Sequence, residues 1–447
     1  MEEFHDHVVV GGGFAGLHCT AKLAEAGFGI TVFEERPELM AGSSRHNFAR
    51  LHHGWHYPGS LETAEECLPP AFDFLVEFGH TLLPAPPNSA GGPLRNGWVA
   101  LATSSFTSRE QWMANAEHLI ECYRAERELR RASFGPTEEF FRRLPKSEWR
   151  TSFNECLISD MASTLEPFID LSVLAGTVIE RLRRYQNIQV RTNHRVVAVD
   201  ASGSGDYPVR LTVVAGKEAR RIHARRVINA SWLSRAMLDR QIAESAGLPP
   251  PDDLTYRLKT FVRIELPSDC RDLPSLLVVH GAFVSFTNFG DGSGLVDYAP
   301  VSNERPSVGR IPDHWYSALA QRWPEKQCQE LIRATMQGVI AYVPALANAR
   351  PISLHASALY HPGTAADVFD PTSAAHHRLG TGVTALTPHW FSLDTGKLSW
   401  VPRHVATVAR AVTGFREQLL ESVDSVDDRE GARSREAPDL ISPACRY

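Results

Sequence analysis

A glycine-rich turn near the N-terminus is the feature that most narrows the folds open to this chain. Gly11, Gly13 and Gly16 form the pattern G-x-G-x-x-G directly after the apolar, β-branched run 8–10. Apolar residues at helical spacing follow the turn, and a second apolar run with strand character lies at 30–35. The order strand, turn, helix, strand predicts a βαβ unit, whose crossover makes its two strands parallel.

Each part of this pattern has a task in binding a dinucleotide. One glycine allows the tight turn, one lets a pyrophosphate approach, and one lets the helix pack on the strand. The helix N-terminus offers free N–H groups and a partial positive charge to phosphates. Glu34, at the end of the second predicted strand, suits a ribose hydroxyl pair and argues against the 2′-phosphate of NADP. We predict that Gly11, Gly13, Gly16, Glu34 and the nearby Arg36 bind NAD or FAD; a turn with a purely structural role is the alternative.

Length and composition narrow the class of protein. The chain has 447 residues, 43% hydrophobic and 22% charged, which is typical of a globular protein with one large or two interleaved domains. A net charge of −6 supplies no basic surface for nucleic acid. No apolar run approaches the roughly 20 residues that span a bilayer, and the glycine pattern begins too early to leave room for a signal peptide. We therefore expect a cytoplasmic protein without a membrane or nucleic-acid partner.

The seven cysteines lie far apart and include no C-x-x-C pair. This spacing favours reduced, unpaired thiols over a disulfide framework or a thiolate zinc site.

Two insertions interrupt the nucleotide-binding pattern. An amphipathic helix is predicted over 108–132, and a hairpin with a Gly/Asp/Ser turn over 276–300. Between them the pattern returns with a helix that Asp170 is expected to cap. We assign 1–75, 156–238 and 355–420 to the nucleotide-binding domain, 76–155 and 239–354 to a substrate domain, and 421–447 to a disordered polar tail.

The segment 42–68, GSSRHNFARLHHGWHYPGSLETAEECL, concentrates polar and aromatic side chains directly after the βαβ unit. His52 and His56 are four residues apart and would share a helix face, as zinc-binding pairs do. A glycine and a proline within the segment argue against a helix, and no carboxylate accompanies the pair, so we predict no metal site. An extended segment would instead put Trp55 and Tyr57 on one face and His56 on the other.

The block 34–58, the run VINASW at 227–232 and the late glycine loop together resemble the FAD-dependent D-amino-acid-oxidase-like superfamily. The run 46–61 is most similar to the L-2-hydroxyglutarate oxidases of that group. The resemblance covers 1–65, 165–235 and 355–415. It implies an α/β fold, in which a Rossmann-type FAD-binding domain is interleaved with an α+β substrate domain built on an antiparallel sheet, and it implies FAD as the cofactor.

The resemblance also implies which residues contact FAD. A Gly/Ser-rich segment would lie along the pyrophosphate and the flavin, and a later strand would hold the adenine through its backbone. A loop before the last helix would place peptide N–H groups or a lysine beside flavin N1 and O2. The corresponding residues are Ser43 and Ser44 for phosphate, Arg45, His46 and Asn47 near the flavin, Val196 or Val197 for adenine, Ala230 and Trp232 at a turn near the cofactor, and Thr395, Gly396 and Lys397 in the late loop. His46 also lies where some relatives attach FAD covalently, and Ser231 and Trp232 replace the usual Ala-Gly pair.

The catalytic groups are expected in the same segment 42–68. We predict that His52, His53 and Tyr57 face the flavin and the substrate, and that Arg50 anchors a substrate carboxylate through its guanidinium. Two arginines of the second insertion are alternative anchors. They are Arg257 and Arg263.

The expected reaction is hydride transfer to flavin N5 from a CH–NH or CH–OH bond of a small, carboxylated substrate, with oxygen or another acceptor regenerating the flavin. Amino acids or amines are favoured as substrates, and 2-hydroxy acids are a close second. The GDGSGL turn at Gly290 has the wrong spacing for a second G-x-G-x-x-G, which weakens the hypothesis of an NADPH-fed monooxygenase. Such a monooxygenase and a non-catalytic nucleotide-binding protein are the two further classes that the sequence leaves open.

Overall fold

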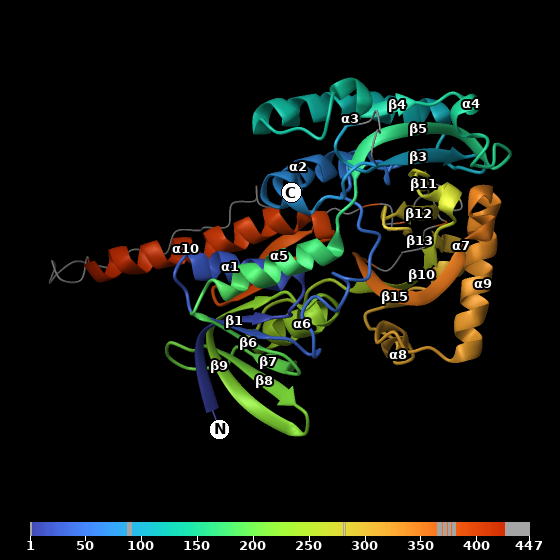
Figure 1. The fold of residues 1–447 in the computed structure, drawn as a ribbon. Helices are drawn as coiled ribbons and strands as arrows, with labels where there is room; N and C mark the ends of the chain where they lie inside the picture. The colour runs from blue at the N-terminus through green and yellow to red at the C-terminus, as the bar shows by residue number, and fades with distance from the viewer. Residues whose placement is uncertain are drawn as a thin grey trace.

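The computed structural model places the chain in two β-sheets with helices packed on their faces (Figure 1). It describes residues 2–86, 92–279, 281, 283–363, 369, 373, 377 and 381–424, with 415–424 described by their backbone alone. None of the helices in this part of the chain has the length and apolar content needed to cross a bilayer.

The first sheet has eight strands and contains the βαβ unit. Its main path runs β16 (Gly382–Thr387), β17 (Trp390–Asp394), β9 (Glu218–Asn229), β1 (Glu2–Val10), β2 (Ile30–Phe33) and β6 (Ile188–Arg191). β1 pairs in parallel with β2 and with β9, as the crossover through α1 (Phe14–Glu25) requires. β7 (Arg195–Asp200) and β8 (Val209–Ala215) continue from β9 as an antiparallel meander. The predicted parallel unit is confirmed.

Both faces of β1 are buried. Val9 belongs to a core shared with α1, α5 (Leu171–Arg183) and α10 (Val401–Asp424), whereas Val8 and Val10 pack with β7, β8 and α6 (Arg235–Ser245). This double burial explains why the strand is a continuous apolar run. α5 begins as predicted, because Asp170 accepts hydrogen bonds from two N–H groups of its first turn, both at 2.9 Å.

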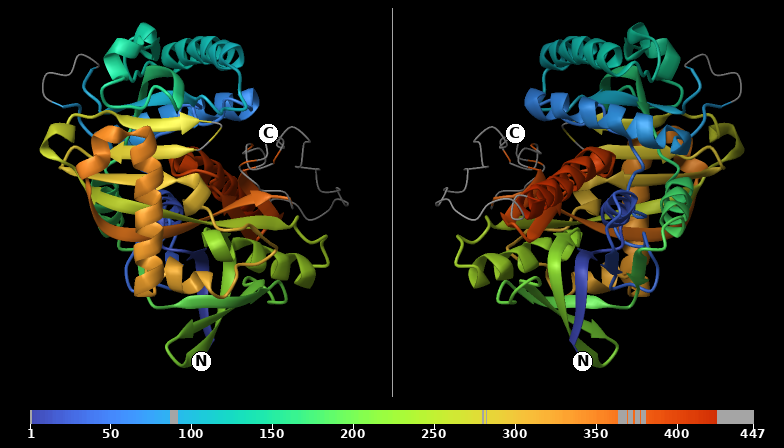
Figure 2. Two further views of the ribbon diagram at one scale, coloured as in Figure 1. Left: turned by 90° about the vertical axis from the view of Figure 1, so that its right-hand side faces the viewer. Right: turned by 90° about the vertical axis from the view of Figure 1, so that its left-hand side faces the viewer.

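The second sheet has nine strands and is almost entirely antiparallel. Its path runs β14 (Ser307–Val308), β10 (Leu254–Glu265), β13 (Ser293–Tyr298), β12 (Val284–Asn288), β11 (Ser275–Val279), β3 (Asn96–Ala102), β5 (Ile158–Pro167) and β4 (Phe141–Arg143), and β15 (Arg350–Pro362) also pairs with β10. The predicted hairpin is β12–β13. α9 (Glu325–Tyr342) runs along one face of this sheet (Figure 2). Val262 and Ile264 of β10 face α9, and the alternating Lys259 and Phe261 face the opposite side.

α2 (Leu61–Phe78) and α3 (Arg109–Arg130) lie side by side, with α2 between α3 and α10, and all three helices contribute to one core (Figures 1 and 2). α3 confirms the predicted amphipathic helix. It begins after Ser108, whose side chain caps it, and its buried face includes Trp112, Leu119 and Tyr123. The shorter helices are α4 (Lys146–Trp149), α7 (Ala299–Ser302) and α8 (Trp315–Leu319).

Strand pairing departs from the predicted segment borders in two places. β5 lies within 156–238, and β15 spans the border between 239–354 and 355–420, yet both strands pair in the second sheet. Each leads from one sheet to the other, and the apolar pattern of a strand does not specify which sheet it joins. The predicted tail begins too early, because α10 continues through residues 421–424. The rest of the tail lies outside the described residues, and the remaining division into domains stays a prediction.

Candidate active site

A cavity of about 370 Å³ opens between the two sheets, at the carboxyl ends of β1 and β9. Ligands of open α/β sheets bind at this end of the strands. Its wall joins segments that are distant in the sequence: the glycine turn, most of residues 41–52 together with 56 and 57, residues 230–234, the loop before α10, and one face of β10. The predicted site residues on this wall are Gly11, Gly13, Glu34, Arg36, Ser43, Ser44, His46, Asn47, Arg50, His52, Tyr57, Val196, Ala230, Trp232, Thr395, Gly396 and Lys397.

Contact geometry explains the glycines of the turn. Gly11 has a φ of +109°, and a Cβ added there would lie 2.6 Å from the carbonyl oxygen of Ala230. A Cβ on Gly16 would collide with the carbonyl oxygen of Gly11, so α1 packs this closely only because residue 16 is glycine. Gly16 therefore acts behind the turn and does not line the cavity. A Cβ on Gly13 would stand 3.1 Å from Ser44 Oγ and narrow the space above the turn.

Glu34 is buried at the end of β2 and is bound to the glycine turn. Its Oε2 accepts the backbone N–H of Gly12 at 2.5 Å, and its Oε1 accepts the N–H of Arg36 at 2.8 Å. Burial raises the pKa of the Glu34 carboxyl, while these two hydrogen bonds oppose the shift. Each oxygen can accept a further hydrogen bond, which suits a pair of ribose hydroxyls.

The two serines of the segment 42–68 lie beside the glycine turn and the N-terminus of α1, the region predicted to bind phosphate. Ser44 Oγ accepts the N–H of Phe14, the first residue of α1, at 2.9 Å. Its hydroxyl proton can then be donated to an anion at the helix N-terminus. Ser43 Oγ accepts the hydroxyl of Ser357 at 3.0 Å. Asn47 stabilises the turn by donating from Nδ2 to the carbonyl oxygens of both serines.

Arg45 and His46 point in different directions. The Arg45 side chain is 63% exposed and pairs with Glu38 at 3.2 Å, so it lies on the surface and not on the cavity wall where it was expected. His46 lines the cavity and stacks on His355, with ring centroids 5.2 Å apart. Burial lowers the pKa of His46 to about 4, which leaves its imidazole neutral at pH 7.

Strand alternation and turn geometry decide which of the remaining predicted cofactor contacts line the cavity. Val196 of β7 is buried and lines the cavity, whereas its neighbour Val197 does not. Trp232 has a φ of +56°, a left-handed conformation that the glycine of the superfamily pattern would adopt at lower cost. The Trp232 indole donates to the carbonyl oxygen of Ala358 at 3.0 Å, which fixes the ring against the second sheet.

In the loop before α10, two peptide N–H groups are bonded locally, and the Lys397 side chain contacts the segment 42–68. The N–H of Gly396 donates to Asp394 Oδ1 at 3.0 Å, and the N–H of Lys397 donates to the carbonyl oxygen of Thr395 at 2.5 Å. Both groups are therefore used within the loop. The Lys397 Nζ donates to Tyr57 Oη at 2.6 Å and lies 4.4 Å from the centre of that ring. This contact joins the late loop to the segment 42–68.

Arg50 is paired with an internal carboxylate. Its Nη1 donates to Glu166 Oε1 at 2.7 Å, and Glu166 is fully buried. Its guanidinium also stands 4.8 Å from the ring centre of Phe168. Nη2 has no hydrogen-bond partner among the described residues. Because Nη2 is buried and Nη1 is paired with Glu166, the structure does not favour Arg50 as the carboxylate anchor that was predicted.

The segment around the histidines is a series of turns, so the predicted extended alternation is wrong. Gly54 has a φ of +104°, and a Cβ there would lie 2.5 Å from the carbonyl oxygen of Ala64. The chain therefore reverses between His52 and His56, and both rings line the cavity with their centroids 5.7 Å apart. Trp55 instead packs into the core beside Phe140.

His53 points into the core and away from the cavity. Its side chain is fully buried between Phe134 and Phe140, with ring centroids 4.4 and 5.6 Å away. Burial lowers the pKa of His53 to about 3, so the ring is neutral. Its backbone N–H donates to Glu166 Oε2 at 2.7 Å. The His53 side chain therefore cannot contact a flavin or substrate in the cavity as predicted, because it points away from the side on which His52 lies.

The second sheet supplies wall residues that the sequence analysis missed. Lys259 pairs with the buried Asp297 at 2.8 Å and lies 4.8 Å from the ring centre of Phe48. Phe261 and Phe283 add apolar surface. The alternation in LTYRLKTFVRIE was a usable signal, since it assigns successive residues of β10 to opposite faces of the sheet.

The alternative anchors lie on the same face of β10 but at different points along the strand. Arg257 lines the cavity, and its Nε donates to His361 Nε2 at 3.0 Å. Arg263 lies outside the cavity, where its Nη2 donates to Ser293 Oγ at 3.1 Å.

Comparison with known proteins identifies the family. The sequence profile of the FAD dependent oxidoreductase family matches residues 6–251, more than half of the chain. The chain therefore belongs to this family, is an FAD-dependent oxidoreductase, and uses FAD as its cofactor.

Solved structures share the fold. The L-alpha-glycerophosphate oxidase of Mycoplasma pneumoniae, solved with FAD bound, aligns with a TM-score of 0.65 at 16% identity over 92% of this chain and 95% of the oxidase. The glycine oxidase of Geobacillus kaustophilus aligns with a TM-score of 0.61 at 14% identity over 92% and 95%. A shorter match of 73 residues, 39% identical, links the chain to the FAD-dependent monooxygenase kojA of Aspergillus flavus. It spans only 16% of either protein.

Proposed function

We propose that FAD occupies the cavity and that the enzyme oxidises a CH–NH bond, or alternatively a CH–OH bond, of a small carboxylated substrate. The observation that carries this proposal is the hydrogen bond from Lys397 Nζ to Tyr57 Oη. It places a cation and a hydroxyl on the wall that also contains the glycine turn. A fixed cation there suits a reaction in which negative charge develops on the cofactor.

The residues near the glycine turn fit the nucleotide half of FAD. Glu34 would accept hydrogen bonds from the ribose hydroxyls, and Ser44 with the N-terminus of α1 would bind the pyrophosphate. Val196, which also lines the cavity, would lie against the adenine. The gap that a Cβ on Gly13 would narrow is the space the phosphates need.

The part of the wall that contains Lys397 and Tyr57 fits a flavin ring. Bound FAD supplies the acceptor for a hydride at N5. Lys397 would hold a positive charge beside the ring system, and the N-terminus of α10 adds a partial positive charge from the same side. Tyr57 accepts from Lys397 and keeps its own hydroxyl proton for a bound substrate.

The segment 50–57 and β10 would orient the substrate. His52 or His56 would accept the proton that the amine or alcohol loses, the usual role of an imidazole at an active site. Arg257 would bind the carboxylate. Lys259 contributes less, since Asp297 already neutralises it. Phe283 would exclude water from the reacting bond.

Anaerobic flavin bleaching with amino acids, N-methylamino acids and 2-hydroxy acids tests the proposal. We expect an amino or N-methylamino acid to reduce the flavin without a nicotinamide, and 2-hydroxy acids form the second arm. Arg257→Met should raise the substrate concentration at half-maximal bleaching, whereas Arg45→Met, which removes an exposed arginine outside the cavity, should not. Failure of every substrate class to bleach the flavin would refute the oxidase proposal.

The match to the fungal monooxygenase supports a second candidate, hydroxylation by a flavin monooxygenase. This activity would consume NADPH together with oxygen, and its substrate alone would leave the flavin oxidised. NADPH oxidation that accelerates when substrate is added would favour it.

A further inference from the structure

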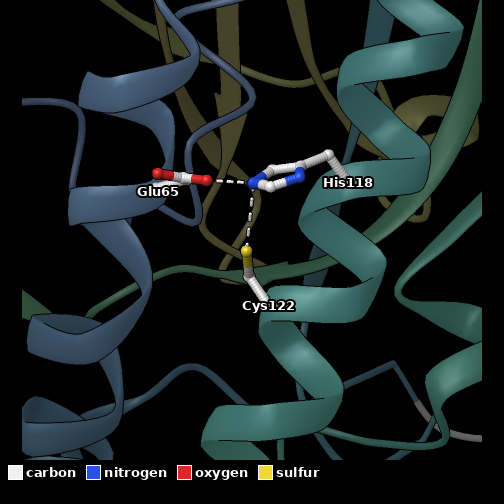
Figure 3. A group of neighbouring side chains, drawn as sticks. All are labelled: Glu65, His118 and Cys122. Carbon is white, nitrogen blue, oxygen red and sulfur yellow. Dashed lines mark hydrogen bonds and ion pairs between the residues drawn. The ribbon is translucent and has the colours of Figure 1, made fainter.

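Outside the cavity, three side chains with metal-binding atoms meet between α2 and α3 (Figure 3). Glu65 comes from α2, and His118 and Cys122 come from α3. The two α3 residues are four positions apart, so they lie on one helix face, directed toward α2. None of the three residues lines the FAD cavity.

The three ligand atoms are close enough together to bind one ion, and the distance between the imidazole nitrogen and the sulfur matches that of two ligands of a tetrahedral site. His118 Nε2 contacts Glu65 Oε1, and Cys122 Sγ lies 3.4 Å from the same nitrogen. All three atoms lie within 4.8 Å of one another. Zinc bonds of about 2.0–2.3 Å to oxygen, nitrogen and sulfur place the ligand atoms of one ion about 3.3–3.8 Å apart. Small side-chain rotations would therefore suffice to surround an ion.

The surroundings favour a cation. The Glu65 and His118 side chains are each 42% exposed, so an ion can reach them from solvent. The carboxylates of Glu65, Glu126 and Glu121 surround the Cys122 thiol with negative charge. Negative charge of this kind attracts a divalent cation.

We propose that Glu65, His118 and Cys122 form a zinc site, with water as the fourth ligand, that links α2 to α3. A donor set of one carboxylate oxygen, one imidazole nitrogen and one thiolate sulfur selects zinc over magnesium or calcium, which prefer oxygen ligands alone.

The site lies behind the segment that carries Tyr57. Asn115, one turn before His118 on α3, donates from Nδ2 to the carbonyl oxygen of Pro58. Zinc would therefore hold together the two helices that support this segment. The site does not depend on the proposed reaction.

Protection of Cys122 from alkylation tests the site on the full-length, FAD-loaded protein. Iodoacetamide labelling of each cysteine is followed by mass spectrometry with and without ZnCl2. We expect ZnCl2 to slow labelling of Cys122 at least tenfold and to leave the exposed Cys156 unchanged. MgCl2 should protect neither thiol.

The variants His118→Ala and Glu65→Gln distinguish a zinc site made by all three side chains from zinc that binds the Cys122 thiol alone. Both side chains are substantially exposed, so these changes should preserve the fold. Zinc protection of Cys122 should fall severalfold in each variant. Equal protection in the wild type and His118→Ala, or no protection in the wild type, would overturn the proposal.

A thermal shift supplies a second readout. ZnCl2 should raise the apparent Tm of the wild type by a few degrees through binding to the folded state. The same addition should not raise the Tm of Cys122→Ser. An equal rise in both proteins would place the zinc elsewhere and refute the site.

Discussion

The buried pair of Arg50 and Glu166 gives the sharpest stability prediction. Glu166 is fully buried and accepts two hydrogen bonds of 2.7 Å, one from Arg50 Nη1 and one from the backbone N–H of His53. Glu166→Ala removes both acceptors and leaves an unpaired guanidinium of which only 5% of the side chain is exposed. Removing one partner of a buried ion pair costs about 3–5 kcal/mol. We expect the free energy of unfolding to fall by this amount.

Two further variants distinguish the contribution of the Glu166 charge to stability from the contribution of its hydrogen bonds. Glu166→Gln keeps one acceptor but removes the charge, and it should cost about 1.5–3 kcal/mol, the range of a hydrogen bond to a charged group. The double variant Arg50→Met, Glu166→Leu removes both charges together and should be less destabilised than Glu166→Ala, since no buried charge is left unpaired.

Urea unfolding at one fixed FAD concentration, followed by tryptophan fluorescence, measures these differences. Arg45→Met, at the exposed ion pair with Glu38, is the matched control and should cost under about 1 kcal/mol. A loss below about 1 kcal/mol in Glu166→Ala, or a double variant less stable than Glu166→Ala, would refute the reasoning.

The other predictions concern the cofactor, the lysine and pH. Gly11→Ala places a Cβ 2.6 Å from a carbonyl oxygen at a φ of +109°, so the purified variant should retain little flavin by absorbance; wild-type occupancy would contradict this. Lys397→Met should slow anaerobic flavin reduction about 10²–10³-fold, as loss of one charge-stabilising donor does, and Lys397→Arg should recover part of the rate. The exposed Lys217→Met is its control, and equal rates in Lys397→Met and the wild type would exclude the role. Burial lowers the pKa of His53 to about 3 and that of His7 to about 4, so between pH 6.5 and 4 the unfolded chain binds protons that the folded chain does not. The contribution of these two histidines to the free energy of unfolding is therefore complete above pH 6.5. It falls toward pH 4, by up to about 1.4 kcal/mol per pH unit for each histidine. In urea titrations at several pH values His53→Phe should flatten this slope, and an unchanged slope would count against the buried position.

Local patterns were sufficient where one short segment determines its own geometry. The glycine turn requires its glycines through contacts among residues that are close in sequence or in adjacent parallel strands, and Asp170 caps the helix that directly follows it. The resemblance then indicated which distant segments complete the cofactor site, and most of them do line one cavity. The resemblance did not predict the directions of individual side chains, since the side chains of Arg45 and His53 point away from the cavity.

The sequence by itself determined the βαβ unit, the family and the segment that follows β2, because strand and helix periodicities and a glycine pattern are encoded locally. Only the tertiary structure decided which side chains meet. Glu166 takes up the charge of Arg50, and Lys397 reaches Tyr57 from 340 positions away. Glu65 meets His118 across two packed helices. In turns, the direction of each side chain follows from backbone dihedral angles and long-range packing, which no periodicity in the sequence records.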